Sequence, residues 1–163
     1  NDSRILRANL DGTNVQTLIV WPQVSDPMGI AVNPAGGKLY WCQSAGNDSR
    51  ILNANLDGSS PTTVLSWPQV LDPKSISLDL LHLKMYWAAG ASTSTRLVRA
   101  GLDGSGVETI VTWPQASDVF GLDVVYTAPI PTVSEWGMAV MILLVLVAGT
   151  LLLLRRDHPA YCE

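Results

Sequence analysis

The stretch Asn47–Pro73 reads NDSRILNANLDGSSPTTVLSWPQVLDP, and the stretch Asn1–Pro27 reads NDSRILRANLDGTNVQTLIVWPQVSDP. They align without a gap and are identical at 18 of 27 positions. A third copy begins at Thr95 with TRLVRAGLDGSGVETIVTWPQASDV. The tryptophans of the three WPQ motifs are Trp21, Trp67 and Trp113, so the period is 46 residues both times. A fixed period of this size indicates repeated structural modules.

Each module contains four short segments that are rich in Val, Ile, Leu, Tyr and Trp, the residues typical of strands. The central segments are Gly29–Asn33, Lys38–Cys42, Arg50–Leu56 and Thr62–Trp67. Turn-forming residues separate them, and no helical apolar period continues past one turn. Four strands in 46 residues are the pattern of one propeller blade. The sequence therefore predicts an all-β fold of four-stranded blades.

Within a module, alternation along Leu39–Cys42 places Leu39 and Trp41 on one face of the strand and Tyr40 and Cys42 on the other. Both faces are largely apolar, as expected for a strand covered by a neighbouring blade on each side. The structural markers of the repeat are Tyr40, Trp41, Tyr86 and Trp87, together with the pairs Asp11-Gly12, Asp57-Gly58 and Asp103-Gly104.

The Asp-Gly pairs have two interpretations. Asp-Gly is a preferred hairpin-turn pair, because Gly tolerates a positive φ. Alternatively, Asp11, Asp57 and Asp103 are three carboxylates at a fixed period that could bind a metal ion. We favour turns and expect no metal or other cofactor, since His82 is the only histidine outside the C-terminal tail.

The motif series I-L-x-A-N-L-D-G, D-P-x-x-I-x-V-N/D and K-L/M-Y-W resembles the YWTD repeats, or low-density-lipoprotein-receptor class B repeats. The resemblance covers about residues 1–126 and implies a six-bladed β-propeller. The family's Thr and Asp of the motif are replaced by Cys42-Gln43 and Ala88-Ala89. In the family those side chains help to tie neighbouring segments together, so the resemblance implies that this chain differs there.

The repeat region is shorter than such a ring. Six modules of 46 residues would require 276 residues, whereas residues 1–126 supply about 2.7 blades. The sequence begins with Asn and shows no export signal. We expect either that upstream blades precede it in a longer protein or that two chains complete a ring.

The composition changes after Tyr126, where residues 127–129 form a short linker. An apolar span follows at 137–154, interrupted by Gly149 and Thr150 and closed by Arg155 and Arg156. Eighteen helical residues reach about 27 Å, enough to cross a hydrocarbon core of about 30 Å. The arginine pair predicts a cytoplasmic end and a short cytoplasmic tail at 157–163. The sequence thus predicts one transmembrane helix, with the repeats outside the cytoplasm. The alternative is a buried core helix.

The tail also carries a motif. The series I-P-T-V-S-E-W-G, an apolar span and R-R, at 130–156, resembles the IPTL-CTERM protein-sorting signal of Gram-negative bacteria. The resemblance implies recognition by an exosortase-like membrane enzyme, cleavage near the motif and transfer towards the cell surface or extracellular matrix. The recognition positions that it implies are Ile130, Pro131, Thr132, Ser134, Glu135, Trp136 and Gly137.

Charge and composition exclude some functions. The net charge of -4 and pI of about 5.0 argue against nucleic-acid binding.

Two motifs leave a choice open. Asp26, Asp72 and Asp118 precede inner strands, where they either cap turns or line a binding mouth. The Trp-Pro-Gln motifs either pack between blades or form an aromatic platform for carbohydrate, and we favour packing.

Together these features predict a non-enzymatic binding or adhesion module at the bacterial cell envelope, with a protein or polysaccharide as its ligand. Two rivals remain. One is a propeller hydrolase or lactonase-like enzyme, for which the inner strands offer Asn33, Asp79 and Asp123. The other is a purely structural matrix protein whose repeats space other domains.

Overall fold

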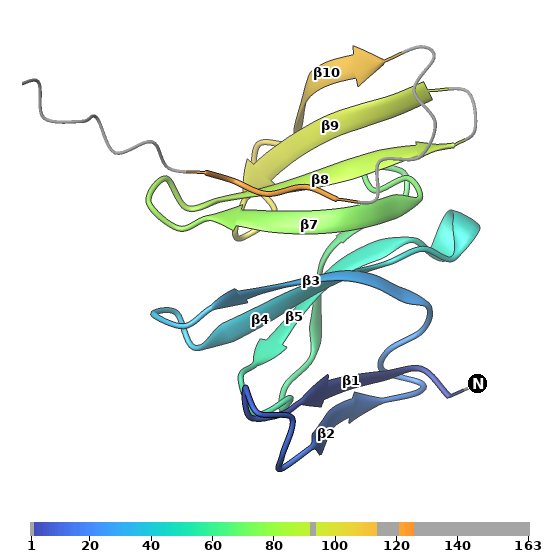
Figure 1. Ribbon diagram of the computed structural model, residues 1–163. Coiled ribbons are helices and arrows are strands. Elements are labelled where there is room, and N and C mark those ends of the chain that lie inside the picture. Colours follow the sequence, from blue (N-terminus) through green and yellow to red (C-terminus); the bar gives the residue numbers. More distant parts are fainter. Residues whose placement is uncertain (1, 92–93, 114–120, 126–163) are drawn as a thin grey trace, which may run out of the picture. The chain divides into compact units, whose positions relative to one another are not determined.

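A computed structural model describes residues 2–91, 94–113 and 121–125 of the chain (Figure 1). The chain divides into two units, Asn1–Val124 and Val125–Glu163. The predicted transmembrane helix at 137–154 and the sorting motif lie outside the described residues. Within the described residues, no helix is long and apolar enough to cross a membrane.

The first unit consists of short strands and one turn of 3-10 helix, η1 (Gly46–Asp48), as the repeated strand-and-turn pattern predicts. The strands are β1 (Arg4–Arg7), β2 (Gln16–Val20), β3 (Pro27–Asn33), β4 (Lys38–Gln43), β5 (Arg50–Asn55), β6 (Thr62–Ser66), β7 (Pro73–Asp79), β8 (Lys84–Ala91), β9 (Ser94–Gly101) and β10 (Glu108–Trp113).

These strands form three antiparallel sheets in chain order: β1-β2, β3-β4-β5-β6 and β7-β8-β9-β10. Both four-stranded sheets have the predicted composition of one blade. Their registers repeat with the sequence, since Trp41 lies opposite Leu52 in the first sheet and Trp87 lies opposite Val98 in the second. The hairpin β1-β2 corresponds to the third and fourth strands of such a blade.

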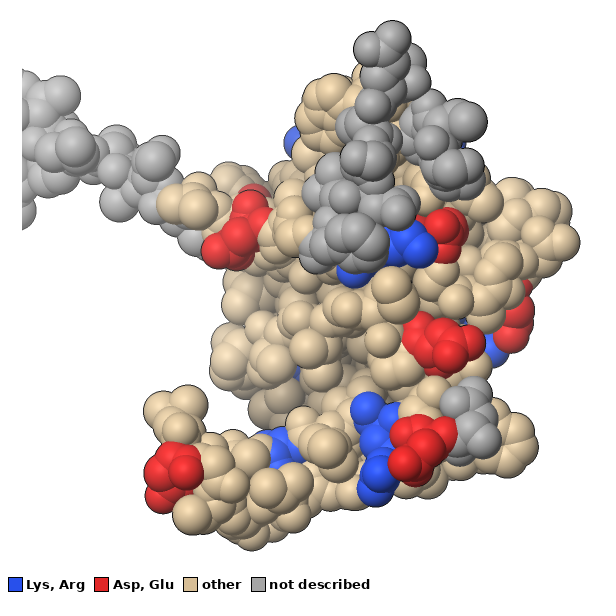
Figure 2. Space-filling view, turned by 45° about the vertical axis from the view of Figure 1, so that its right-hand side comes forward, with Lys and Arg blue, Asp and Glu red and all other residues tan. Residues whose placement is uncertain are grey.

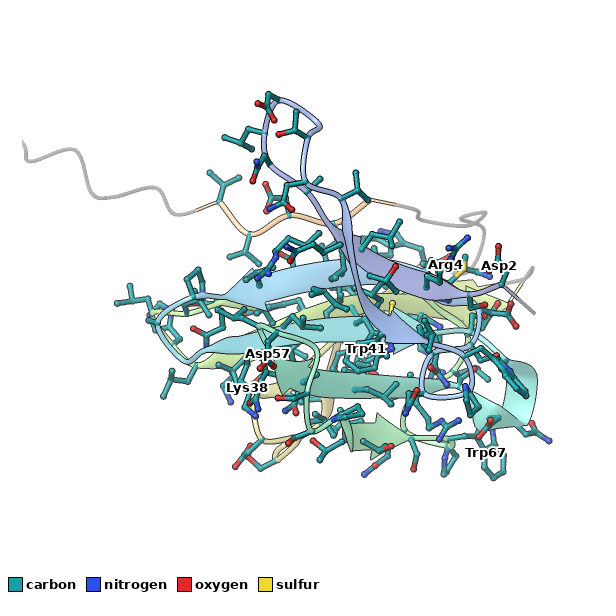
Figure 3. The ribbon with its side chains drawn as sticks, turned by 90° about the horizontal axis from the view of Figure 1, so that it is seen from below. Asp2, Arg4, Lys38, Trp41, Asp57 and Trp67 are labelled. Atoms are coloured by element: carbon teal, nitrogen blue, oxygen red, sulfur yellow. The ribbon has the colours of Figure 1, made fainter. Side chains whose placement is uncertain are left out.

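The two faces of β4 contribute to two separate cores, as the alternation predicts. Leu39 and Trp41 pack with Ile5 and Leu52 between the β1-β2 hairpin and the next sheet. Tyr40 and Cys42 belong to a second core that also contains Met85 and Trp87 of β8, together with residues of β5, β6, β7 and β9. The first four-stranded blade therefore buries its second strand on both sides, and Figure 3 shows Trp41 in the interior.

Inner strands of neighbouring sheets approach so closely that one position requires glycine. A Cβ on Gly29 of β3 would lie 2.9 Å from the Cα of Ser75 in β7. Real Cβ atoms essentially never come so close, so any larger residue would push the sheets apart. The next module has Ser75 where this one has Gly29.

The turns of each sheet lie at two opposite ends. Because neighbouring strands are antiparallel, the β3–β4 and β5–β6 turns share one end, and the β4–β5 turn lies at the other. In Figure 3, Asp57 of the β5–β6 turn and Trp67, just after β6, lie towards opposite ends. We call these the Asp-Gly end and the Trp-Pro end.

Candidate functional site: the Trp-Pro-Gln turns

The Trp-Pro end presents the same turn in consecutive blades. After β6, the backbone N–H of Trp67 donates to the carbonyl of Ser49 at 3.0 Å. The N–H groups of Gln69 and Val70 both donate to the carbonyl of Ser66, at 3.1 and 3.2 Å. Val70 is fully buried beneath the turn. Four residues thus form a fixed platform on the end of the blade.

The preceding hairpin repeats this geometry after β2. The N–H of Trp21 donates to the carbonyl of Ser3 at 3.1 Å, and the N–H of Gln23 donates to that of Val20 at 3.1 Å. Val24 is fully buried, like its counterpart Val70. The Trp21-Pro22 and Trp67-Pro68 peptide bonds are both cis.

The tryptophans of these turns are half-exposed, which differs from the predicted packing between blades. Trp21, Trp67 and Trp113 are 54%, 47% and 42% exposed. The inter-blade position is filled instead by the valine three residues after the tryptophan, and by Trp41 and Trp87, which are fully buried. An aromatic side chain that is exposed at the same position of every module indicates an interaction site more strongly than a single scattered apolar residue does.

The Asp-Gly pairs at the opposite end form turns. The Asp57 carboxylate accepts a hydrogen bond from the N–H of Ser59 at 2.9 Å, and Gly58 has a φ of 84°. Hydrogen bonding by Ser59, first from its side chain, lowers the pKa of Asp57. Asp11 and Asp103 have equivalent contacts with Thr13 and Ser105, and their pKa values are lowered in the same way.

These turns also join the blades. A Cβ on Gly58 would lie 2.3 Å from the carbonyl oxygen of Leu18 in β2, and one on Gly104 would lie 2.8 Å from that of Val64 in β6. The tips of the β5–β6 and β9–β10 hairpins therefore pack on the outer strand of the preceding blade. Among the described residues, no group of three His, Cys, Asp or Glu side chains is arranged to hold a metal ion.

Polar contacts between blades join Asp72, which the sequence singles out, to residues that it does not. The hydroxyl of Ser44, after β4, donates to Asp72, before β7. Asp72 also accepts from the ammonium of Lys74 at 3.0 Å, and the Cys42 thiol lies 3.9 Å from the carbonyl of Pro73. Asp72 thus ties two blades together.

Asp26 is the counterpart of Asp72 in the preceding module. Its contact with a neighbouring strand pair is made by the backbone, because its N–H donates to the Ser3 hydroxyl at 3.3 Å. Both aspartates have a positive φ, of 43° and 42°. Asp118 lies outside the described residues.

The inner-strand residues named for the enzyme alternative, Asn33, Asp79 and Asp123, each accept a hydrogen bond from a backbone N–H nearby in the sequence. Asp79, which is buried, accepts from the backbone N–H of His82 at 2.8 Å and contacts the imidazole Nδ1 at 2.7 Å. This Asp-His pair was not predicted from the sequence, although the three-residue spacing across a turn could have indicated it. Asn33 accepts from the N–H of Gly36 at 2.8 Å in the equivalent turn.

An apolar groove lies between β1 and β3, lined by Ile5, Leu6, Ile30 and Val32 among others. Leu6 and Ile30 are both 52% exposed, whereas their counterparts one period later, Leu52 and Ile76, are both 5% exposed. Strand β4 covers both counterparts, because Trp41 packs in one core with Leu52 and Tyr40 packs in the other with Ile76. The groove is therefore where a further strand pair of the repeat pattern would pack.

Charges on the face in Figure 2 alternate in sign. Acidic and basic side chains lie next to one another there, and the structure pairs Arg4 with Asp2 at 2.8 Å and Arg50 with Asp48 at 3.0 Å. A nucleic-acid surface needs a continuous basic patch. This face does not provide one.

Comparisons with known proteins identify the fold. No family model matches the chain, and no curated protein matches it. A chain in the crystal structure of the nidogen/laminin complex is 24% identical, with a TM-score of 0.60 over 67% of this chain and 40% of its own length. A protein described as TolB from Agrobacterium tumefaciens is 17% identical, with a TM-score of 0.57 over 67% of this chain and 41% of its own.

These neighbours and the sheet topology define the first unit as β-propeller blades. The chain spans about two fifths of the length of each neighbour. The residues predicted for sorting, Ile130 to Gly137, and for the membrane stop, Arg155 and Arg156, lie outside the described residues.

Proposed function

We propose that this protein is a non-enzymatic binding module, which a C-terminal sorting signal delivers to the bacterial cell envelope. Its ligand contacts are made by the Trp-Pro-Gln turns. The observation that carries this proposal is the exposure of Trp67. Its blade has the β1-β2 hairpin on one side and the β7-β10 sheet on the other, yet the indole remains 47% exposed. Its exposure therefore does not arise from an uncovered blade face.

The chemistry of these turns suits a polysaccharide. The C–H face of a sugar ring is apolar and packs on an indole, while its hydroxyl groups form hydrogen bonds with side-chain amides. Each turn supplies both groups, because Gln23 and Gln69 are exposed two residues after Trp21 and Trp67. The net charge of -4 disfavours an acidic polymer, so a neutral one fits best.

Repetition of the turn favours a polymeric ligand. A chain of sugars can occupy one turn after another, and each further contact is then intramolecular. Weak binding at each tryptophan becomes firm binding along the row. A protein ligand is the alternative, because tryptophan is also common in the centre of protein interfaces.

Delivery to the envelope rests on the tail. The sorting motif, the apolar span and the arginine pair support insertion with the repeats outside the cytoplasm. An exosortase-like enzyme would then recognise residues 130–137 and release the module towards the cell surface. In this proposal the hydrolase and the structural matrix protein remain the rivals.

A binding screen on glycan and protein arrays tests the function, with the full chain held in lipid nanodiscs. The test variant replaces Trp21, Trp67 and Trp113 by Ala, and the control replaces Leu10 and Val15, two exposed apolar residues between β1 and β2, by Ala. We expect neutral glycans to bind the parent and the control but not the test variant. Glycan binding that survives in the test variant, or binding confined to proteins, would contradict the polysaccharide assignment.

A further inference from the structure

The turn between β7 and β8 is unusually apolar for a loop. It consists of Leu80, Leu81, His82 and Leu83, which we call the leucine turn. Leu81 and Leu83 are 73% and 63% exposed. One period earlier, the β3–β4 turn has Pro34, Ala35, Gly36 and Gly37 at the same positions. Three leucines thus replace small or turn-forming residues on the surface of one blade.

The backbone of the leucine turn makes this replacement more unusual. Leu83 has a φ of 53°, and its counterpart Gly37 has a φ of 64°. Glycine adopts this left-handed conformation freely, whereas a residue with a Cβ is disfavoured there. Such residues persist when surrounding contacts hold them, and they are concentrated at functional positions.

Contacts from two directions hold the leucine turn. The buried Asp79 accepts the N–H of His82 at 2.8 Å and contacts its ring at 2.7 Å. The carbonyl of Leu83 accepts the N–H of Leu102, in the β9–β10 turn, at 3.0 Å. Leu81 and Leu83 are therefore presented by a braced turn.

The first unit's last described residues run beside β7 towards this turn (Figure 1). The N–H of Val124 donates to the Ser77 hydroxyl at 3.2 Å, and Ser77 lies two residues before the end of β7. The chain thus leaves the first unit at the Asp-Gly end, beside the leucine turn. Twelve residues separate Val124 from the apolar span at 137–154, so the extended chain between them reaches about 45 Å at most.

We propose that the leucine turn inserts Leu81 and Leu83 into the surface of the membrane that holds the apolar segment. This inference rests on the membrane anchoring in the proposed function. Lys84 follows the turn and would lie at the level of the lipid headgroups, where cations are favoured. Tethering raises the local concentration of the turn at the bilayer, so two leucines suffice for the contact. The Trp-Pro end then faces away from the membrane.

A fluorescent probe at position 82 tests this arrangement. The probe NBD is attached to His82→Cys in a chain that also carries Cys162→Ser, and this full chain is reconstituted in phosphatidylcholine vesicles. Cys42 is buried and its thiol pKa is raised to about 11, so it escapes labelling at neutral pH. Matched controls carry the probe at Asn47→Cys, in η1 at the other end, and at Ala35→Cys, the counterpart of Leu81.

We expect a blue shift at position 82 and loss of its emission with doxyl-labelled lipids, but neither change at position 47 or 35. Adding Leu81→Ser and Leu83→Gly should abolish both effects. Water-like emission at position 82, in a chain that floats with the vesicles, would overturn the inference and assign the turn to a protein partner. A chain that does not float would instead overturn the anchoring itself, so the two failures are distinguishable.

Discussion

Replacing Trp41 by Ala should destabilise the first unit far more than replacing Trp67, which has the same side chain at the blade surface. Trp41 is fully buried among Leu39, Leu52 and the β1-β2 hairpin. Truncation of a buried aromatic residue lowers the free energy of unfolding by about 3–5 kcal/mol. Among the described residues the indole N–H of Trp41 has no hydrogen-bond partner, and its removal relieves about 1 kcal/mol of desolvation. The net loss should therefore be about 3 kcal/mol.

Trp67→Ala should lower the free energy of unfolding by about 1 kcal/mol, because a half-exposed ring leaves no closed cavity. The difference corresponds to a melting temperature about 8 °C lower for Trp41→Ala than for Trp67→Ala. Near-ultraviolet circular dichroism of the full chain in nanodiscs measures both melts, and Trp87→Ala provides a repeat of Trp41→Ala one period later. Equal losses for Trp41→Ala and Trp67→Ala would refute the assignment of buried and exposed positions.

Four further outcomes are expected. Asp57→Asn should change the free energy of unfolding by less than about 0.5 kcal/mol, because Asn accepts the same turn hydrogen bond, and a chelator should not change the melting temperature. If a chelator lowers the melting temperature and Asp57→Asn lowers it equally, the Asp-Gly turns hold a metal ion instead. Burial raises the pKa of the Cys42 thiol from 9.0 to about 11. The free energy of unfolding should therefore fall as pH rises from about 9 to 11, because the unfolded chain loses this proton first. Urea titrations should show a fall about 2–3 kcal/mol larger for the parent than for Cys42→Ala. Joint replacement of Pro131 and Thr132 should leave membrane insertion intact but prevent release, and equal release from the variant and the parent would reduce the tail to an anchor. A phosphatase fused after Glu163 should be inactive, because the arginine pair places that end in the cytoplasm, and an active fusion would reverse the topology.

The strands and turns of the blade could be predicted from the sequence, because the patterns that define them are local. Alternation along Leu39–Cys42 assigned each side chain to a face, and the Asp57-Gly58 pair marked a turn through the backbone preference of its own residues. Both depend on neighbours a few positions away, so they can be read without knowing what the strand packs against. The period of 46 residues then extended one blade to the next.

Only the tertiary structure decided which member of each motif faces solvent. Trp67 and Val70 are both apolar residues of one turn, and the buried position between blades accommodates Val70 while the larger indole remains outside. The contacts of Ser44 with Asp72 and of Val124 with Ser77 join residues from different modules, which no local pattern relates. Burial is a property of the stacked blades, because the volume available to a side chain is set by the neighbouring sheet and not by the residues that precede and follow it.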